Sequence, residues 1–254
     1  MELNYKVFGE GRDLIVLHGL FGSLDNWVSL GKKWSENYRV WLVDQRNHGK
    51  SPHSEEFSYQ AMADDLLHFM KQHQIEKAII LGHSMGGKTA MEFAIHNEEM
   101  IYKLIVVDIA PVKYRVHHYK VLQALNAVEV SSLNSRNQAD EIMQEYLPEF
   151  GVRQFLLKNL DRKSDGSYDW KFNLKVLEEQ ILPISEWAIS EGKYEKDVLF
   201  IKGELSEYIL PEYASEISQK FPSYDLEIIS NAGHWVHAEK PAEFFEIASH
   251  FMKD

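Results

Sequence analysis

Short apolar runs alternate with longer amphipathic segments along most of this 254-residue chain, and this alternation restricts its fold more than any other feature. Such runs are typical of parallel strands that are covered on both faces. Between them, residues 61–74 and the segment that contains Phe244 and Phe251 repeat apolar side chains every three or four positions, as helices do. The pattern predicts an α/β fold, with a mostly parallel sheet flanked by helices. The buried strands that we expect are Leu14–Leu17, Val40–Val43, Ala78–Leu81, Leu104–Val107, Val198–Ile201 and Leu226–Ile229.

The alternation stops between about Val112 and Lys196, where no strand-like run occurs. Helical patterns cover Tyr114–Val128, Ala139–Tyr146 and Phe172–Ile181. We therefore expect one α/β core formed by residues 1–112 and 196–254, with residues 113–195 inserted as a helical cap, or lid. The aromatic and leucine side chains of this insertion fit ordinary helix packing and, as a less favoured alternative, the lining of a ligand pocket.

Composition excludes several classes of function. The formal net charge of -12 argues against nucleic-acid binding, which depends on clustered Lys and Arg. The chain has no cysteine, so disulfides, thiolate metal sites and a cysteine nucleophile are excluded. No basic leader precedes an apolar run, and no stretch approaches the roughly 20 apolar residues of a membrane span. We expect a cytoplasmic protein, and the sequence carries no signal for a particular oligomeric state.

A nucleophilic serine is indicated by Gly82-His83-Ser84-Met85-Gly86, which follows the apolar run Ala78–Leu81 and precedes a helical pattern. A sharp turn between strand and helix crowds the backbone, and glycines on both sides of the serine relieve that crowding. The alternative is that the two glycines only let a helix pack on a strand. The presence of partner residues elsewhere decides between these interpretations.

The base that Ser84 needs is predicted to be His234, which lies in a turn just after the strand Leu226–Ile229. Open α/β sheets place their active sites at the carboxyl ends of strands, and the order serine before histidine agrees with a serine hydrolase. A surface histidine is the alternative. His234 and His237 could also be a metal pair, but no further ligand set accompanies them.

Oxyanion donors are expected from the backbone amides of Leu20, in the loop after the first strand, and of Met85, at the start of the helix after Ser84. Unpaired amides and the helix dipole at this end favour developing negative charge. We predict structural roles for His18 and His83, because proton transfer is already assigned to His234.

Four groups of residues together carry a family resemblance over nearly the whole chain. They are His18-Gly19-Leu20-Phe21-Gly22-Ser23, Asp44-x-Arg46-x-x-Gly49-x-Ser51, Gly82-His83-Ser84-Met85-Gly86-Gly87, and Gly233-His234-Trp235 with the residues that follow to Pro241. This set resembles the α/β-hydrolase family. Asn47-His48, Asp108-Ile109-Ala110-Pro111 and Gln154-Phe155-Leu156-Leu157-Lys158 are closer still to the YbfF-type esterases. The resemblance implies a helical cap after the sixth strand and hydrolysis of acyl esters or acyl thioesters.

The acid of the triad is displaced from the family's usual position. Most members place it three residues beyond the glycine that here is Gly203, where this chain has Ser206. Asp108, at the end of the strand Leu104–Val107, is our preferred candidate, and YbfF-type proteins resemble this chain in that displacement. Glu204 or Glu207 could serve instead, or Asp108 could be purely structural.

The expected reaction is attack by Ser84 on an acyl carbonyl, with no metal or organic cofactor. Phe21, Lys113, Arg115 and His117 are candidate substrate contacts, and the basic ones could meet an anionic group such as the phosphates of coenzyme A. A solvated helix face is the alternative for the basic segment. Carbon–carbon bond hydrolases and perhydrolases share the same serine set, and a catalytically silent ligand-binding module belongs to a different class. An epoxide hydrolase or dehalogenase would need a carboxylate in place of Ser84.

Overall fold

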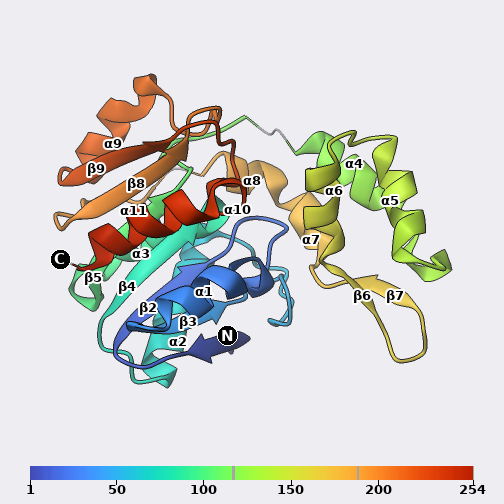
Figure 1. Ribbon diagram of the computed structural model, residues 1–254, viewed down its shortest axis with the longest axis horizontal. Helices are drawn as coiled ribbons and strands as arrows, with labels where there is room; N and C mark the ends of the chain where they lie inside the picture. The colour runs from blue at the N-terminus through green and yellow to red at the C-terminus, as the bar shows by residue number, and fades with distance from the viewer. Residues whose placement is uncertain (116–117, 188, 254) are drawn as a thin grey trace.

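A seven-stranded sheet forms the centre of the computed structural model, which describes residues 1–115, 118–187 and 189–253 (Figure 1). All six apolar runs lie in its parallel strands, as predicted, and one additional strand at the amino-terminal edge runs antiparallel to its neighbour. In spatial order the strands are β1 (Tyr5–Phe8), β3 (Tyr38–Val43), β2 (Arg12–Leu17), β4 (Ala78–His83), β5 (Ile101–Val107), β8 (Val198–Gly203) and β9 (Tyr224–Ile229).

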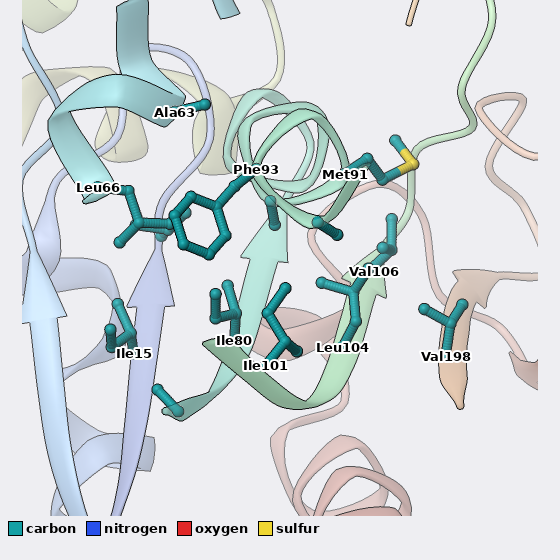
Figure 2. Close-up of a cluster of buried hydrophobic side chains, with 14 of the residues drawn as sticks. Ile15, Ala63, Leu66, Ile80, Met91, Phe93, Ile101, Leu104, Val106 and Val198 are labelled. Carbon is teal, nitrogen blue, oxygen red and sulfur yellow. The ribbon is translucent and has the colours of Figure 1, made fainter. Parts of the chain in front are cut away.

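Helices cover both faces of the sheet. On one face α2 (Tyr59–Gln72), α3 (Met85–His96) and α9 (Ala214–Lys220) bury apolar side chains, and on the other α1 (Val28–Trp34) and α11 (Pro241–Lys253) do so. Figure 2 shows Leu66 of α2 and Phe93 of α3 above Ile15 of β2 and Ile80 of β4. Both faces of the central strands are therefore in apolar surroundings, which explains their continuous apolar sequence.

Two strands differ from the sequence-based expectation. Residues Leu226–Ile229 form a strand, but Leu226 is 40% and Ile228 53% exposed, so the prediction of a buried strand was wrong there. The reason is that β9 is the last strand of the sheet and pairs only with β8. The short strand β1 was not predicted because most of its residues are exposed, which leaves no apolar run.

The described residues between β5 and β8 form five α-helices: α4 (Tyr119–Ala127), α5 (Arg136–Gln144), α6 (Phe150–Leu157), α7 (Leu174–Glu179) and α8 (Ile181–Ser185). The first four form a lobe beside the sheet (Figure 1). Leu125 of α4, Leu156 of α6 and Leu177 of α7 share an apolar cluster that also includes Phe21 and Met85. The lobe thus packs against the loop after β2 and the start of α3.

Several details of this segment correct the sequence-based expectation. It contains a hairpin of two three-residue strands, β6 (Leu160–Arg162) and β7 (Tyr168–Trp170), which are too short to give a periodic signal. It follows β5, the fifth strand of the chain, and not a sixth strand, because only β1 to β4 precede β5. The predicted helix from Phe172 to Ile181 is divided between α7 and α8.

The remaining helical elements are short. They are η1 (Leu24–Trp27), η2 (Glu98–Met100), η3 (Val130–Ser132), η4 (Pro211–Tyr213) and the four-residue α10 (Val236–Glu239). Within the described ranges, no helix has both the length and the apolar character needed to span a bilayer.

Candidate active site

Ser84 occupies a sharp turn between β4 and α3. Its φ of 53° and ψ of -115° lie in a region that non-glycine residues rarely adopt. A Cβ at position 82 would lie 2.2 Å from the carbonyl oxygen of Gly86, and a Cβ at position 86 would lie 2.4 Å from that of Leu17. Only glycine fits at both places, so the chain on either side of Ser84 can close into the turn. The Ser84 amide also donates to the carbonyl of Val107 at 2.9 Å, which ties the turn to β5.

Asp108 and His234 are brought together from the ends of two separate strands. Nδ1 of His234 lies 2.7 Å from Oδ2 of Asp108, and because a carboxylate only accepts, Nδ1 carries the donated proton. Asp108 is completely buried and directly follows β5, with its amide donating to Ile201 of β8 at 2.8 Å. The structure thus places Asp108 next to His234, as expected from the sequence.

Two further donors hold the Asp108 carboxylate. The amide of Gly203 donates to Oδ1 at 3.1 Å, and the hydroxyl of Ser206 donates to Oδ2. Ser206, which occupies the position where the acid was first expected, is therefore a hydrogen-bond partner of Asp108. The alternative acids lie elsewhere: Glu204 accepts from the Asn231 amide at 2.8 Å, and Glu207 is hydrogen-bonded to no described residue.

Other side chains fix the His234 ring and its backbone. The Tyr208 ring stacks on His234 with a centroid distance of 4.1 Å, and burial with the nearby Asp108 charge raises the pKa of Tyr208 to about 12. Nε2 of His83 donates to the carbonyl of His234 at 2.9 Å. Burial holds the pKa of His83 well below its ordinary value, so the neutral ring suits this positional role.

The loop after β2 lies against Ser84. A Cβ at Gly19 would be 3.2 Å from Cβ of Ser84, so the loop approaches this closely only because residue 19 is a glycine. His18 and His48 support the loop from behind. Nε2 of His18 accepts from the Gln45 amide at 3.0 Å, and Nε2 of His48 accepts from the Phe21 amide at 3.3 Å. Burial lowers the pKa of His18 to about 4 and that of His48 to about 3, so both nitrogens remain acceptors near neutrality.

The two amides predicted as oxyanion donors are available for a ligand. In the part of the chain that the structure describes, no group accepts a hydrogen bond from the amide of Leu20 or of Met85. Met85 is the first residue of α3, where the amide has no partner within the helix. Both residues line a cavity together with Ser84.

Two cavities meet at Ser84. The larger, of about 190 Å³, is lined by Phe21, His234, Phe155 and Trp235, and the smaller, of about 40 Å³, by Met85 and Lys88. Both are lined by Leu20, Ser84, His118 and Tyr208.

The candidate substrate contacts separate into three groups. Phe21 lines the larger cavity and Arg115 the smaller one. Lys113 is exposed and is not among the residues that line either cavity. His117 lies outside the described residues.

Three residues of the site were missed by sequence analysis. Tyr208 covers His234, and Lys88 lies in the smaller cavity. Asn159, in the lobe, donates to the carbonyl of Phe21 at 2.7 Å and so fixes the loop after β2. Lys88 was the one with a sequence signal, because it is the single charged residue in the first turns of an otherwise small and apolar helix, four positions after Ser84.

The pairing of His234 with His237 as metal ligands has no support in the geometry. His237 is buried and stacks on Trp27 at a centroid distance of 4.2 Å. Within the described chain, no cluster of three or more His, Asp or Glu side chains is arranged to hold a metal ion.

Comparison with known proteins agrees with this geometry. The family model for the alpha/beta hydrolase fold matches residues 14–241, which include every residue of the Ser84 site described above. The chain belongs to the α/β-hydrolase family. Within it, this hydrolase is 40% identical over 242 residues to the Escherichia coli protein "Esterase YbfF", covering 95% of this chain and 93% of that protein.

Other similar proteins also carry names of ester-cleaving enzymes. A zebrafish (Danio rerio) protein named "sn-1-specific diacylglycerol lipase ABHD11" is 36% identical, with 100% of this chain and 83% of that protein covered. A solved structure described as "Marine microorganism esterase" is 41% identical and superimposes with a TM-score of 0.96, covering 98% of this chain and 99% of the other. These relatives support a YbfF-type hydrolase that acts on esters.

Proposed function

We propose that this protein is a serine esterase in which Ser84 is the nucleophile, His234 the base and Asp108 the acid of a catalytic triad. The observation that carries the proposal is the 2.7 Å contact between His234 Nδ1 and Asp108, on a ring that lines the same cavity as Ser84. The buried carboxylate sets the tautomer in which Nε2 is free to accept a proton. The strained backbone of Ser84 is typical of a residue held for function.

The reaction follows from these positions. Ser84 Oγ attacks the acyl carbonyl while His234 Nε2 takes its proton, and the amides of Leu20 and Met85 stabilise the resulting oxyanion. Protonated His234 then donates to the departing alcohol or thiol, which leaves an acyl-enzyme. Water attacks this ester with His234 again as base, and the acid product and free Ser84 are released.

Residues 113–195 would act as a cap over this site. The cluster that joins the lobe to Phe21 and Met85 supports this role, since it brings the lobe directly to the two cavities.

Within this proposal, acyl-coenzyme A thioesters are substrates alongside simple esters, with Arg115 and the exposed Lys113 near the anionic coenzyme. Replacing both with Gln should raise KM for acyl-coenzyme A and leave KM for uncharged esters unchanged. An equal rise for both substrates would contradict the coenzyme contact. A cytoplasmic location stays a prediction, which cell fractionation would test.

The decisive experiment combines covalent labelling with a substrate panel. We expect a fluorophosphonate probe to label the wild type and not Ser84→Ala, and 4-nitrophenyl esters of increasing acyl length to be hydrolysed only by the wild type. Ser218→Ala, in an exposed position on α9, is the matched control and should behave as the wild type. Unchanged hydrolysis by Ser84→Ala would overturn the serine mechanism. Labelling of Ser84 without hydrolysis of any ester would overturn the esterase assignment.

A further inference from the structure

Lys88 is a buried lysine beside the nucleophile. It lies four positions after Ser84 on α3, is only 2% exposed, and lines the smaller cavity together with Ser84. Its ammonium nitrogen lies 4.8 Å from the ring centroid of Tyr114, 5.0 Å from that of Trp187 and 5.5 Å from that of Tyr59. Tyr59 begins α2, Tyr114 lies between β5 and α4, and Trp187 lies between α8 and β8, so the ammonium is enclosed by three separate parts of the chain.

This cation has no anionic partner in the protein. No described residue accepts a hydrogen bond from Lys88 or forms an ion pair with it, and the residues that line the smaller cavity include no Asp or Glu. Glu92, one turn further along α3, is occupied by Ser190 and His96. Burial lowers the pKa of Lys88 to about 7. Cation–π contacts recover only part of the lost hydration, so a buried ammonium of this kind favours a ligand that brings a negative charge.

The chemistry of the proposed reaction decides which part of a substrate enters this cavity. The leaving group must accept a proton from His234, and His234 lines the larger cavity but not the smaller one. The alcohol or thiol therefore occupies the larger cavity. The acyl group, on the other side of the carbonyl carbon, then extends along α3 into the smaller cavity, toward Lys88.

We propose that Lys88 binds a carboxylate at the far end of the acyl group, so that the preferred substrates are esters or thioesters of short dicarboxylic acids. This inference rests on the proposed serine esterase function and deepens it. Lys88 is in this scheme a specificity residue of the acyl pocket.

The size of the cavity sets the length of the acyl group. One turn of α3, on the order of 6 Å along the helix axis, separates Ser84 from Lys88. The cavity of about 40 Å³ is large enough for a few groups of the size of a water molecule, each of which needs about 10–15 Å³. An acyl group of about three to five carbons with a terminal carboxylate meets both limits.

The test compares two substrates that differ only in charge. Monoethyl succinate carries a terminal carboxylate, and ethyl succinamate replaces it with an uncharged amide of nearly the same shape. Ethanol release gives kcat/KM for each. We expect the wild type to prefer the anionic ester, and Lys88→Met, an uncharged side chain only one atom shorter, to lower the ratio of the two kcat/KM values by about 10- to 100-fold. Lys71→Met, the same exchange at an exposed position of α2, should leave the ratio unchanged.

Two outcomes overturn the inference while the proposed function stands. One is a wild type whose kcat/KM for ethyl succinamate equals its kcat/KM for monoethyl succinate. The other is a Lys88→Met variant with an unchanged ratio, which would make Lys88 a structural residue held by its aromatic neighbours. If Lys88→Met does not fold, competitive inhibition of the wild type decides: succinate should inhibit at least about tenfold more strongly than butyramide, and equal inhibition refutes the inference. Hydrolysis of neither ester, nor of any in the nitrophenyl panel, would count against the esterase itself.

Discussion

Asp108→Asn gives the sharpest test of the triad, because the structure specifies what the substitution does to the proton on His234. Oδ2 of Asp108 accepts from His234 Nδ1 and from Ser206, while Oδ1 accepts from the Gly203 amide. The amide group of Asn must face one of these two sides. On the Gly203 side it would meet a backbone donor, so it turns toward His234 and Ser206.

That orientation reverses the histidine tautomer. Nδ1 of His234 must then accept a hydrogen bond, its proton moves to Nε2, and Nε2 can no longer take the proton of Ser84. Loss of Nε2 as the proton acceptor lowers kcat by about 10⁴, which is equivalent to about 5 kcal/mol of transition-state stabilisation. Folding should survive, because the Asn Nδ2 can donate to His234 Nδ1 and to Ser206 Oγ, and Oδ1 still accepts from the Gly203 amide. Only the Ser206 hydroxyl proton loses its acceptor, and Asn tolerates the φ of 51° at position 108.

The measurement is kcat with a 4-nitrophenyl ester, after the background rate of Ser84→Ala has been subtracted. Glu204→Gln is the matched control, since it removes a carboxylate near the same strand end and should stay within about twofold of the wild type. Thermal unfolding should show both variants folded. A folded Asp108→Asn that retains more than about a tenth of wild-type kcat, or a Glu204→Gln that loses as much as Asp108→Asn, would refute the assignment of the acid.

Three further predictions follow from single contacts. Ser206→Ala removes a donor to a buried carboxylate and should lower the free energy of unfolding by about 1–3 kcal/mol in denaturant titrations; an unchanged value would remove Ser206 as a support of Asp108. Gly86→Ala places a Cβ 2.4 Å from the Leu17 carbonyl and should destabilise by more than about 2 kcal/mol, whereas Gly151→Ala, with nothing within 4 Å, should stabilise by about 0.5–1 kcal/mol; equal effects would contradict the close approach. The preference for monoethyl succinate over ethyl succinamate should fall as pH rises from about 6 to about 8, because Lys88, with a pKa of about 7, loses its charge in this interval.

The ratio of the two kcat/KM values removes any pH effect that is common to both substrates, and comparison with Lys88→Met separates Lys88 from His118, which also lines the smaller cavity. The hydroxyls that face Lys88 stay neutral over this interval, since burial raises the pKa of Tyr59 and of Tyr114 well above the ordinary value. A ratio that does not change with pH in the wild type, or that changes equally in Lys88→Met, would show that another group is titrating.

The central part of the fold could be predicted from the sequence because the middle strands are buried on both faces and read as continuous apolar runs. The same signal fails at the edges of the sheet, where β1 is largely exposed and β9 alternates charged with exposed apolar residues. It also fails in the lobe. The helix predicted from Tyr114 begins only at Tyr119, since the Tyr114 hydroxyl bonds the Ala110 amide and the Tyr208 carbonyl. Such long-range contacts override a local helical pattern.

The candidate site shows the same division. The placement of Ser84, His234 and the amides of Leu20 and Met85 around the two cavities could be predicted, because local turns and chain order mark these positions. The roles of Lys88 and Tyr208 could not be predicted in this way, because their neighbours are far from them in sequence. Lys88 lies against Tyr59 of α2 and Trp187 after α8, and Tyr208 stacks on His234. What a single lysine in a helix does depends on which side chains the tertiary fold places around it.

The acid illustrates why a position in space matters more than a position in the chain. Val107 of β5 lies in register with Ile201 of β8, so the residues just beyond these two parallel strands emerge side by side. Asp108 and Ser206 consequently reach the same point, where the hydroxyl of one meets the carboxylate of the other. In the proposed triad, His234 needs a carboxylate at that point, and the end of either strand can supply it. An acid that follows β5, together with a serine that follows β8, would therefore satisfy the same geometry as an acid that follows β8, and the serine adds a donor that holds the buried charge.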